Sequence, residues 1–184
     1  MTKMRIVAAA VALVVAWGGL AAAEKVKSGP QVGDKVPGPF EPLNITGPTA
    51  GEKACLYCRF GSSPVAMIFA REATPEVKAL LQKIDSCCTK NDEMNSCVIF
   101  CSDESGMDKK LKSMAQDAGL KKLVVSLDTA HGPEGYNVTK DAAVTVLLYR
   151  DRVVKANYAF KKGELNDKSV EKVATEAGKL AAAK

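Results

Sequence analysis

The stretch that decides the fold is residues 65–84, which read VAMIFAREATPEVKALLQKI. Its first six residues are an unbroken apolar run of strand length, which is typical of a strand buried on both faces of a parallel sheet. Thr74, Pro75 and Glu76 then supply the N-cap, the early proline and the first-turn acid of a helix start. Apolar residues follow at helical spacing, so the stretch predicts a buried strand leading into an amphipathic helix.

The alternation of strand and helix continues on both sides of this stretch. Further helices are expected to open near residues 105 and 166. Further strands are expected at residues 40–45, 52–57, 98–100, 123–127, 143–149 and 153–158. The first two of these strands, and also the last two, predict hairpins across short turns. The order indicates an α/β fold with a mainly parallel central sheet, antiparallel edge hairpins and flanking helices.

The N-terminal residues have the pattern of a secretory signal. Lys3 and Arg5 precede an apolar run at residues 6–17, and alanines at 21–23 follow it. We therefore expect a signal peptide at residues 1–23, cleaved after Ala23, and an extracytoplasmic location, periplasmic or secreted. The alternative is an uncleaved membrane anchor, because the uncharged stretch is just long enough to span a bilayer. A tether at residues 24–35 and one domain at residues 36–184 are expected to follow.

Composition narrows the function classes. The formal net charge of +5 is too mild to indicate nucleic-acid binding, and the lysines are spread along the chain instead of clustering with aromatic residues. Six cysteines are too few for a scaffold that depends on disulfides, but an even number in an exported chain favours some bridges. Nothing in the sequence decides the oligomeric state.

The element order and several weak motifs resemble those of a known family. The motifs are VGDKVP at residues 32–37, the hairpin return and loop at 52–64, the strand at 65–70, and Tyr136-Asn137-Val138 followed by the strand at 144–149. Over residues 32–181 the chain resembles thioredoxin-fold proteins of the exported peroxiredoxin and thiol–disulfide oxidoreductase type. The resemblance implies a thioredoxin-like fold and action on protein thiols and disulfides.

Two positions depart from that family. The family's reactive cysteine follows the central strand, and here that place is REATPE at residues 71–76, without a cysteine. The family's cis-proline falls at Val144 in this sequence. A peroxiredoxin-type peroxidase at the usual position is therefore not expected.

A Cys-x-x-Cys motif instead lies before the central strand, at Cys55 and Cys58. Nearby Lys53 and Arg59 are cations of the kind that lower a thiol pKa, which favours a redox pair. Arg59 stands where a c-type haem motif needs histidine, so haem attachment is excluded. The two cysteines can bridge each other only if the segment turns, since residues i and i+3 of an extended strand point to opposite faces.

Strand direction places five cysteines at one edge of the expected sheet, namely Cys55, Cys58, Cys87, Cys88 and Cys97. Three interpretations follow. The bridges are structural, in a non-catalytic binding domain; or Cys55 and Cys58 are a catalytic redox pair resolved by Cys87, Cys88 or Cys97; or thiolates of Cys55, Cys58 and the Cys87-Cys88 pair hold a metal. The expected function is thiol–disulfide exchange through Cys55 and Cys58, with no cofactor and no metal assigned. His131, Asp103 and Glu104 are expected in solvated loops.

Overall fold

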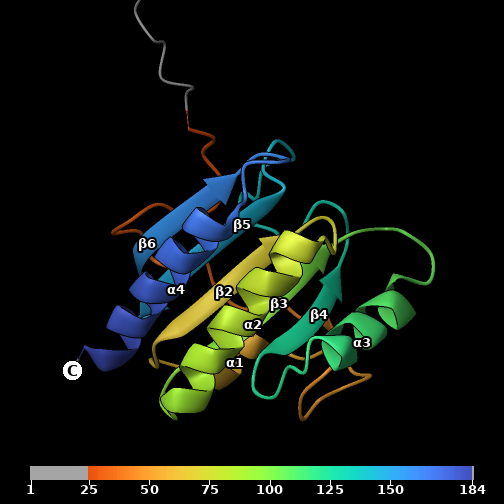
Figure 1. Cartoon of the computed structure of the whole chain (residues 1–184), viewed down its shortest axis with the longest axis horizontal. Helices are drawn as coiled ribbons and strands as arrows, with labels where there is room; N and C mark the ends of the chain where they lie inside the picture. Colours follow the sequence, from red (N-terminus) through yellow and green to blue (C-terminus); the bar gives the residue numbers. More distant parts are fainter. Residues whose placement is uncertain (1–24, 184) are drawn as a thin grey trace, which may run out of the picture.

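The computed structural model describes residues 25–183, so the expected signal peptide lies outside the described residues. Within residues 25–183, one six-stranded sheet, ordered β1-β4-β3-β2-β5-β6, carries four helices (Figure 1). The elements in chain order are β1 (Leu43–Asn44), α1 (Leu56–Phe60), β2 (Val65–Ala70), α2 (Pro75–Lys90), β3 (Asn95–Cys101), α3 (Met107–Asp117), β4 (Val124–Asp128), β5 (Val144–Arg150), β6 (Val153–Phe160) and α4 (Asp167–Ala182).

The sheet is mixed in direction. β2, β3 and β4 run parallel, β5 lies antiparallel to β2, β6 lies antiparallel to β5, and β1 lies antiparallel to β4. Val65 pairs with Asn95, so β2 and β3 begin at the same edge of the sheet. The expected α/β fold, with a parallel centre and antiparallel edges, is confirmed.

The stretch at residues 65–84 folds as its pattern predicts. Every residue of β2 is at most 1% exposed, because β2 is paired on both sides and covered on both faces. The Thr74 hydroxyl accepts a hydrogen bond from the Val77 N–H at 3.3 Å, and Pro75 opens the helix. Val77, Leu80 and the other apolar residues of α2 are buried against the sheet.

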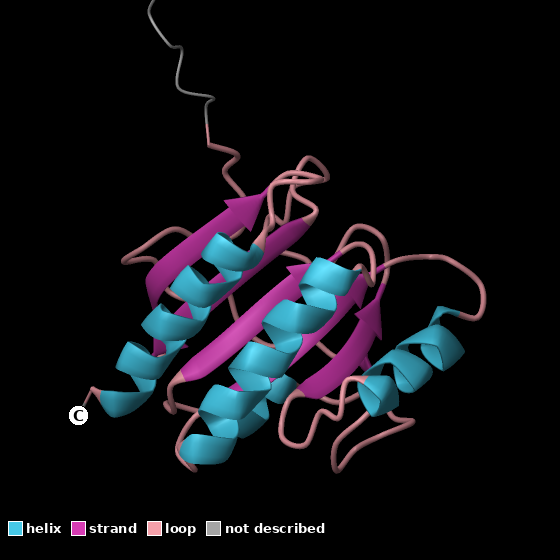
Figure 2. Ribbon diagram, viewed as in Figure 1, coloured by secondary structure: helices cyan, strands magenta, loops and turns pink. Residues whose placement is uncertain are grey.

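The two faces of the sheet have separate apolar cores. The three long helices α2, α3 and α4 cover one face, where they pack on alternate residues of β2, β3 and β5 (Figure 2). On the other face, Leu56, Tyr57 and Phe60 of α1 pack on the remaining strand residues. The short helix α1 is therefore fixed by its contact with the sheet, since five residues are too few for an independent helix.

The expected first hairpin forms, but its second arm is short. Leu43 and Lys53 are bridged, and Asn44 N–H donates to the Glu52 carbonyl at 2.9 Å. The strand expected at residues 52–57 gives way to helix from Leu56. Leu56 and Phe60 are four residues apart, which places them on one helical face and allows both to be buried. Gly61 then ends the helix with a φ of 58° and a ψ of −124°, a combination that glycine adopts readily.

Residues 28–36 pack on β5 and β6, although residues 24–35 were expected to form a tether. Ser28 is 1% exposed and its hydroxyl accepts a hydrogen bond from Thr145 Oγ1 at 2.6 Å. The N–H of Gly33 donates to the Val154 carbonyl at 2.9 Å. A Pro- and Gly-rich sequence pattern does not predict backbone pairing of this kind.

Among the helices at residues 25–183, none combines the length and apolar character needed to cross a membrane.

Candidate functional site

The central feature of the candidate site is a disulfide between Cys55 and Cys58. Cys55 is the N-cap of α1, so the chain turns between the two cysteines and brings their Cα atoms to 5.4 Å, inside the usual range for a disulfide. The Cys58 N–H donates to Cys55 Sγ at 3.1 Å. The segment from Cys55 to Cys58 is therefore a turn and not an extended strand, and the two cysteines bridge each other.

The two cysteines differ in exposure. Cys58 is exposed, while Cys55 is half-buried and packs against the apolar core beneath α1. Leu56 and Tyr57, between them, are 1% and 9% exposed. A molecule in solution therefore reaches the pair from the Cys58 side.

An arginine from the far end of the sequence lies beside this helix. The guanidinium of Arg152 stacks over the Tyr57 ring, with its Cζ 4.9 Å from the ring centroid. Arg152 and Asp151 form the two-residue turn between β5 and β6. The turn is tied to its neighbours, because Asp151 N–H donates to the Ser62 carbonyl at 3.1 Å and Val36 N–H donates to the Arg152 carbonyl at 2.8 Å.

The backbone of this turn is left-handed at both positions. Asp151 has φ 54° and Arg152 has φ 61°. Two-residue hairpin turns of this hand favour Asn, Asp and Gly, so Asp151 suits its position, whereas a left-handed conformation costs a residue such as arginine about 1–2 kcal/mol. Arg152 therefore occupies a position that its backbone preference does not explain.

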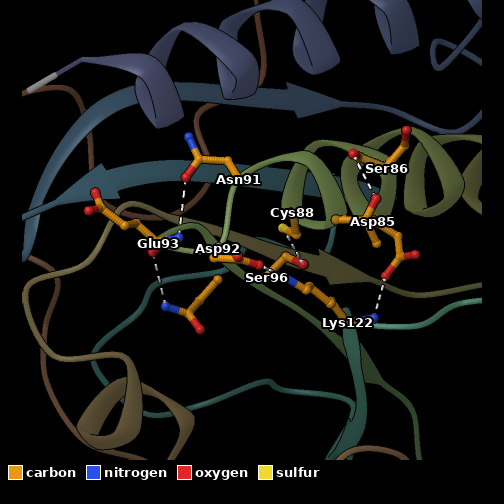
Figure 3. Close-up of polar contacts among 10 residues, drawn as sticks. Asp85, Ser86, Cys88, Asn91, Asp92, Glu93, Ser96 and Lys122 are labelled. Carbon is orange, nitrogen blue, oxygen red and sulfur yellow. Dashed lines mark hydrogen bonds and ion pairs between the residues drawn. The ribbon is translucent and has the colours of Figure 1, made fainter.

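Cys87 and Cys88 lie in the last turns of α2, on the sheet face opposite α1, and neither is bridged. Cys88 Sγ donates to Ser96 Oγ at 3.1 Å (Figure 3). Burial raises the pKa of the Cys88 thiol to about 11. The Asp85 carboxylate anchors the same helix by accepting the backbone N–H of Lys122 at 2.8 Å.

Cys97 and Cys101 lie on the same sheet face as α1, at opposite ends of β3, and both are free and buried. Burial raises the pKa of Cys97 far above its ordinary value, and it raises the pKa of Cys101 to about 12. A buried thiol that stays protonated is a poor nucleophile. The structure thus forms none of the bridges considered for Cys87, Cys88 and Cys97, and Cys97 is the only one of the three on the face that carries α1.

The thiolate metal interpretation is not supported by this arrangement. Cys55 and Cys58 are joined to each other, and Cys87 and Cys88 lie across the sheet from them. No group of three or more histidine, cysteine or acidic residues with metal-binding geometry occurs within residues 25–183.

At the opposite edge of the sheet, residues 71–76 take the place where the family's reactive cysteine was expected, and they begin with Arg71. The guanidinium of Arg71 donates to four backbone carbonyls, which belong to Ala130, Val138, Thr139 and Ala142, at 2.7–3.3 Å. Val144 occupies the position of the cis-proline, and the described residues contain no cis peptide bond. Arg71 therefore links the loops at this edge, an arrangement called the Arg71 clamp below, and residues 71–76 contain no thiol.

The remaining polar residues at that edge are solvated or locally bonded. Asp103 Oδ1 accepts the Ala130 N–H at 3.0 Å, and Glu104 lies 3.8 Å from Lys110 in an exposed ion pair. His131 is exposed. The sequence pattern did not predict a role for Arg71 or Arg152, because the contacts of both residues are with segments that are distant in the chain.

Comparison with known proteins identifies solved structures that share this fold. No protein-family model matches the sequence, and no curated protein matches it. Among solved structures, one from Chlorobium tepidum described as a thiol:disulfide interchange protein DsbE has a TM-score of 0.62 at 15% identity, covering 83% of this chain and 99% of that one. A DsbF homologue from Corynebacterium diphtheriae has a TM-score of 0.60 at 12% identity, with 85% and 96% covered. Peroxidoxin BcpB from Mycobacterium tuberculosis has a TM-score of 0.59 at 14% identity, with 83% and 99% covered.

These similarities define a thioredoxin-like fold. They confirm the resemblance expected from residues 32–181, and the fold alone assigns no activity.

Proposed function

We propose that this protein is an exported thioredoxin-like domain that exchanges thiols and disulfides through Cys55 and Cys58. The observation that carries the proposal is the asymmetric disulfide itself. Cys58 is accessible, and Cys55 Sγ already accepts a backbone hydrogen bond. The pair lies at the edge opposite the family's usual site, where residues 71–76 contain no cysteine.

The asymmetry assigns a role to each sulfur. An incoming substrate thiolate attacks Cys58 Sγ, so that a mixed disulfide forms and the bond to Cys55 breaks. The electron pair of that bond stays on Cys55, where the hydrogen bond from the Cys58 N–H stabilises the thiolate. The second thiolate of the substrate then attacks the substrate sulfur in the mixed disulfide. The substrate disulfide forms, and Cys58 is released as a thiolate. The substrate dithiol is oxidised, the cysteine pair is reduced, and two protons pass from the substrate to the cysteine thiolates or to water. The reverse sequence reduces a substrate disulfide.

Two observations support an extracytoplasmic setting. Residues 1–23 have the pattern of a secretory signal, and an oxidising compartment permits a disulfide to persist. A thioredoxin-like neighbour from Corynebacterium glutamicum, with a TM-score of 0.57, is described as a secreted thiol-disulfide isomerase. Such neighbours suggest protein thiols and disulfides as the substrate class. A non-catalytic domain with a permanent bridge is the second candidate, because residues 71–76 contain no cysteine and Val144 falls where the family's cis-proline is expected.

Insulin reduction tests the proposal. The wild-type protein is expected to accelerate precipitation of the insulin B chain by dithiothreitol, since the accessible pair exchanges with the insulin disulfides. The double variant Cys55→Ser, Cys58→Ser is expected to fall to the rate of dithiothreitol alone, while Cys101→Ser is expected to keep the wild-type rate. A wild-type rate equal to that of the double variant would favour the non-catalytic domain.

A further inference from the structure

We infer that Arg152 supplies a fixed positive charge that stabilises the thiolate formed when the Cys55–Cys58 pair is reduced. The inference rests on the proposed function, because it concerns the same pair. It adds a residue from the β5–β6 turn to a site that the sequence assigns to residues 53–59 alone.

The contact with α1 places the charge. Arg152 lies over the ring of Tyr57, and Tyr57 precedes Cys58 directly in the helix. An arginine guanidinium stays protonated throughout the range in which cysteine titrates. Arg152 is exposed, but its stacking on Tyr57, a residue that is 9% exposed, holds the charge over the residue that precedes Cys58.

The turn that carries Arg152 is the second line of evidence. Left-handed backbone at Arg152 favours glycine, yet a long charged side chain occupies the position and its carbonyl accepts the Val36 N–H at 2.8 Å. A residue that opposes its local backbone preference marks a position where another role outweighs that preference. The only stacking contact of this side chain in the described part of the chain is with Tyr57 of α1.

The other charges around α1 do not replace this one. Arg59 lies in α1 and Lys53 precedes it, and both are exposed, as Arg152 is. Within residues 25–183 the side chains of Lys53 and Arg59 make no ion pair and no contact with an aromatic ring, and Asp151 is an exposed anion on the same turn as Arg152. Beneath α1, the Cys97 thiol and the Tyr149 hydroxyl stay neutral near pH 7, because burial raises the pKa of both. Among the described residues, Arg152 is thus the cation that a ring contact fixes on α1, at the residue next to Cys58.

Reduction creates the charge that Arg152 would stabilise. Two equivalents of an external thiol transfer two electrons to the pair, the bond between Cys55 and Cys58 breaks, and the external thiols become a disulfide. The two released protons bind the cysteine sulfurs, and the more acidic thiol gives its proton to water at its pKa. Removal of a nearby cation raises that pKa.

The test is a titration of the reduced protein, monitored by ultraviolet thiolate absorbance, with the double Cys55, Cys58 serine variant as baseline. Arg152→Gln is expected to raise the lower pKa of the pair by about 0.5–1, which lowers the thiolate fraction near neutral pH about three- to tenfold. Arg152→Gly is expected to raise it equally and to fold at least as well, because glycine suits the turn. Lys155→Gln, on the other sheet face of the same hairpin, is the matched control and is expected to leave the pKa unchanged.

An unchanged pKa in both Arg152 variants would overturn the inference, and so would an equal rise in the Lys155→Gln control. The titration uses no protein substrate, so it separates the two ideas. A raised pKa together with an insulin rate no better than background would retain the role of Arg152 and refute the proposed function.

Discussion

Replacing Cys55 by serine is expected to turn the protein into a trap that accumulates mixed disulfides through Cys58. Cys58 is exposed and can attack or be attacked, but without Cys55 no neighbouring thiol releases the bound partner. Serine is itself a good N-cap, so the substitution should preserve α1. The matching variant Cys58→Ser leaves the half-buried Cys55 and is expected to trap little.

The measurement is mass spectrometry of each variant after incubation with a disulfide-containing peptide and quenching with acid. A near-stoichiometric adduct on Cys55→Ser and a minor one on Cys58→Ser are expected. The Cys101→Ser variant, which keeps the pair intact, serves as the control and should accumulate no adduct. Equal adducts on the two single variants would contradict the asymmetry, and a larger adduct on Cys58→Ser would reverse the two roles.

Replacing Arg71 by methionine is expected to lower the free energy of unfolding by about 2–4 kcal/mol. A hydrogen bond to a charged group contributes about 1.5–3 kcal/mol, and four carbonyls lose their donor together. The loss is smaller than the sum because the site is half-buried and water can reach part of it. Urea unfolding monitored by circular dichroism measures the change.

Two further variants make this result specific. Arg71→Lys keeps the charge with fewer directed donors and is expected to lose less stability, while Arg59→Met at an exposed site should change stability by less than about 0.5 kcal/mol. Folded Arg71→Met is expected to retain thiol exchange, since Arg71 lies at the edge opposite the Cys55–Cys58 pair. A wild-type unfolding midpoint in Arg71→Met would contradict the clamp, and lost exchange in the folded variant would show that the usual edge still takes part.

The centre of the fold could be predicted because its signals are local. The apolar run of β2 and the cap residues Thr74 and Pro75 belong to one continuous stretch, and their meaning does not depend on tertiary contacts. The end of the first hairpin was mispredicted as strand, because α1 is too short to show helical periodicity. Its existence depends on the burial of Leu56 and Phe60 against strands that follow later in the chain.

The candidate site could be predicted from the sequence only in part, for the same reason. The Cys-x-x-Cys spacing identifies Cys55 and Cys58 as a possible pair, but whether they bridge depends on the turn at Cys55 that tertiary packing imposes. Arg152 could not be associated with them, because its contact with Tyr57 requires Arg152 to adopt a left-handed conformation in the β5–β6 turn that arginine disfavours. The clamp at Arg71 likewise joins carbonyls far away in the chain.

The most direct test of the central claim is a redox titration of the native protein in glutathione buffers, with alkylation and mass spectrometry to identify the cysteines that change. If Cys55 and Cys58 are an exchanging pair, they alone should gain label on reduction, with a reduction potential above about −300 mV, while Cys87, Cys88, Cys97 and Cys101 keep the same state throughout. A Cys55–Cys58 bond that resists millimolar thiol in the folded protein, or a bridge that joins other cysteines, would contradict the claim.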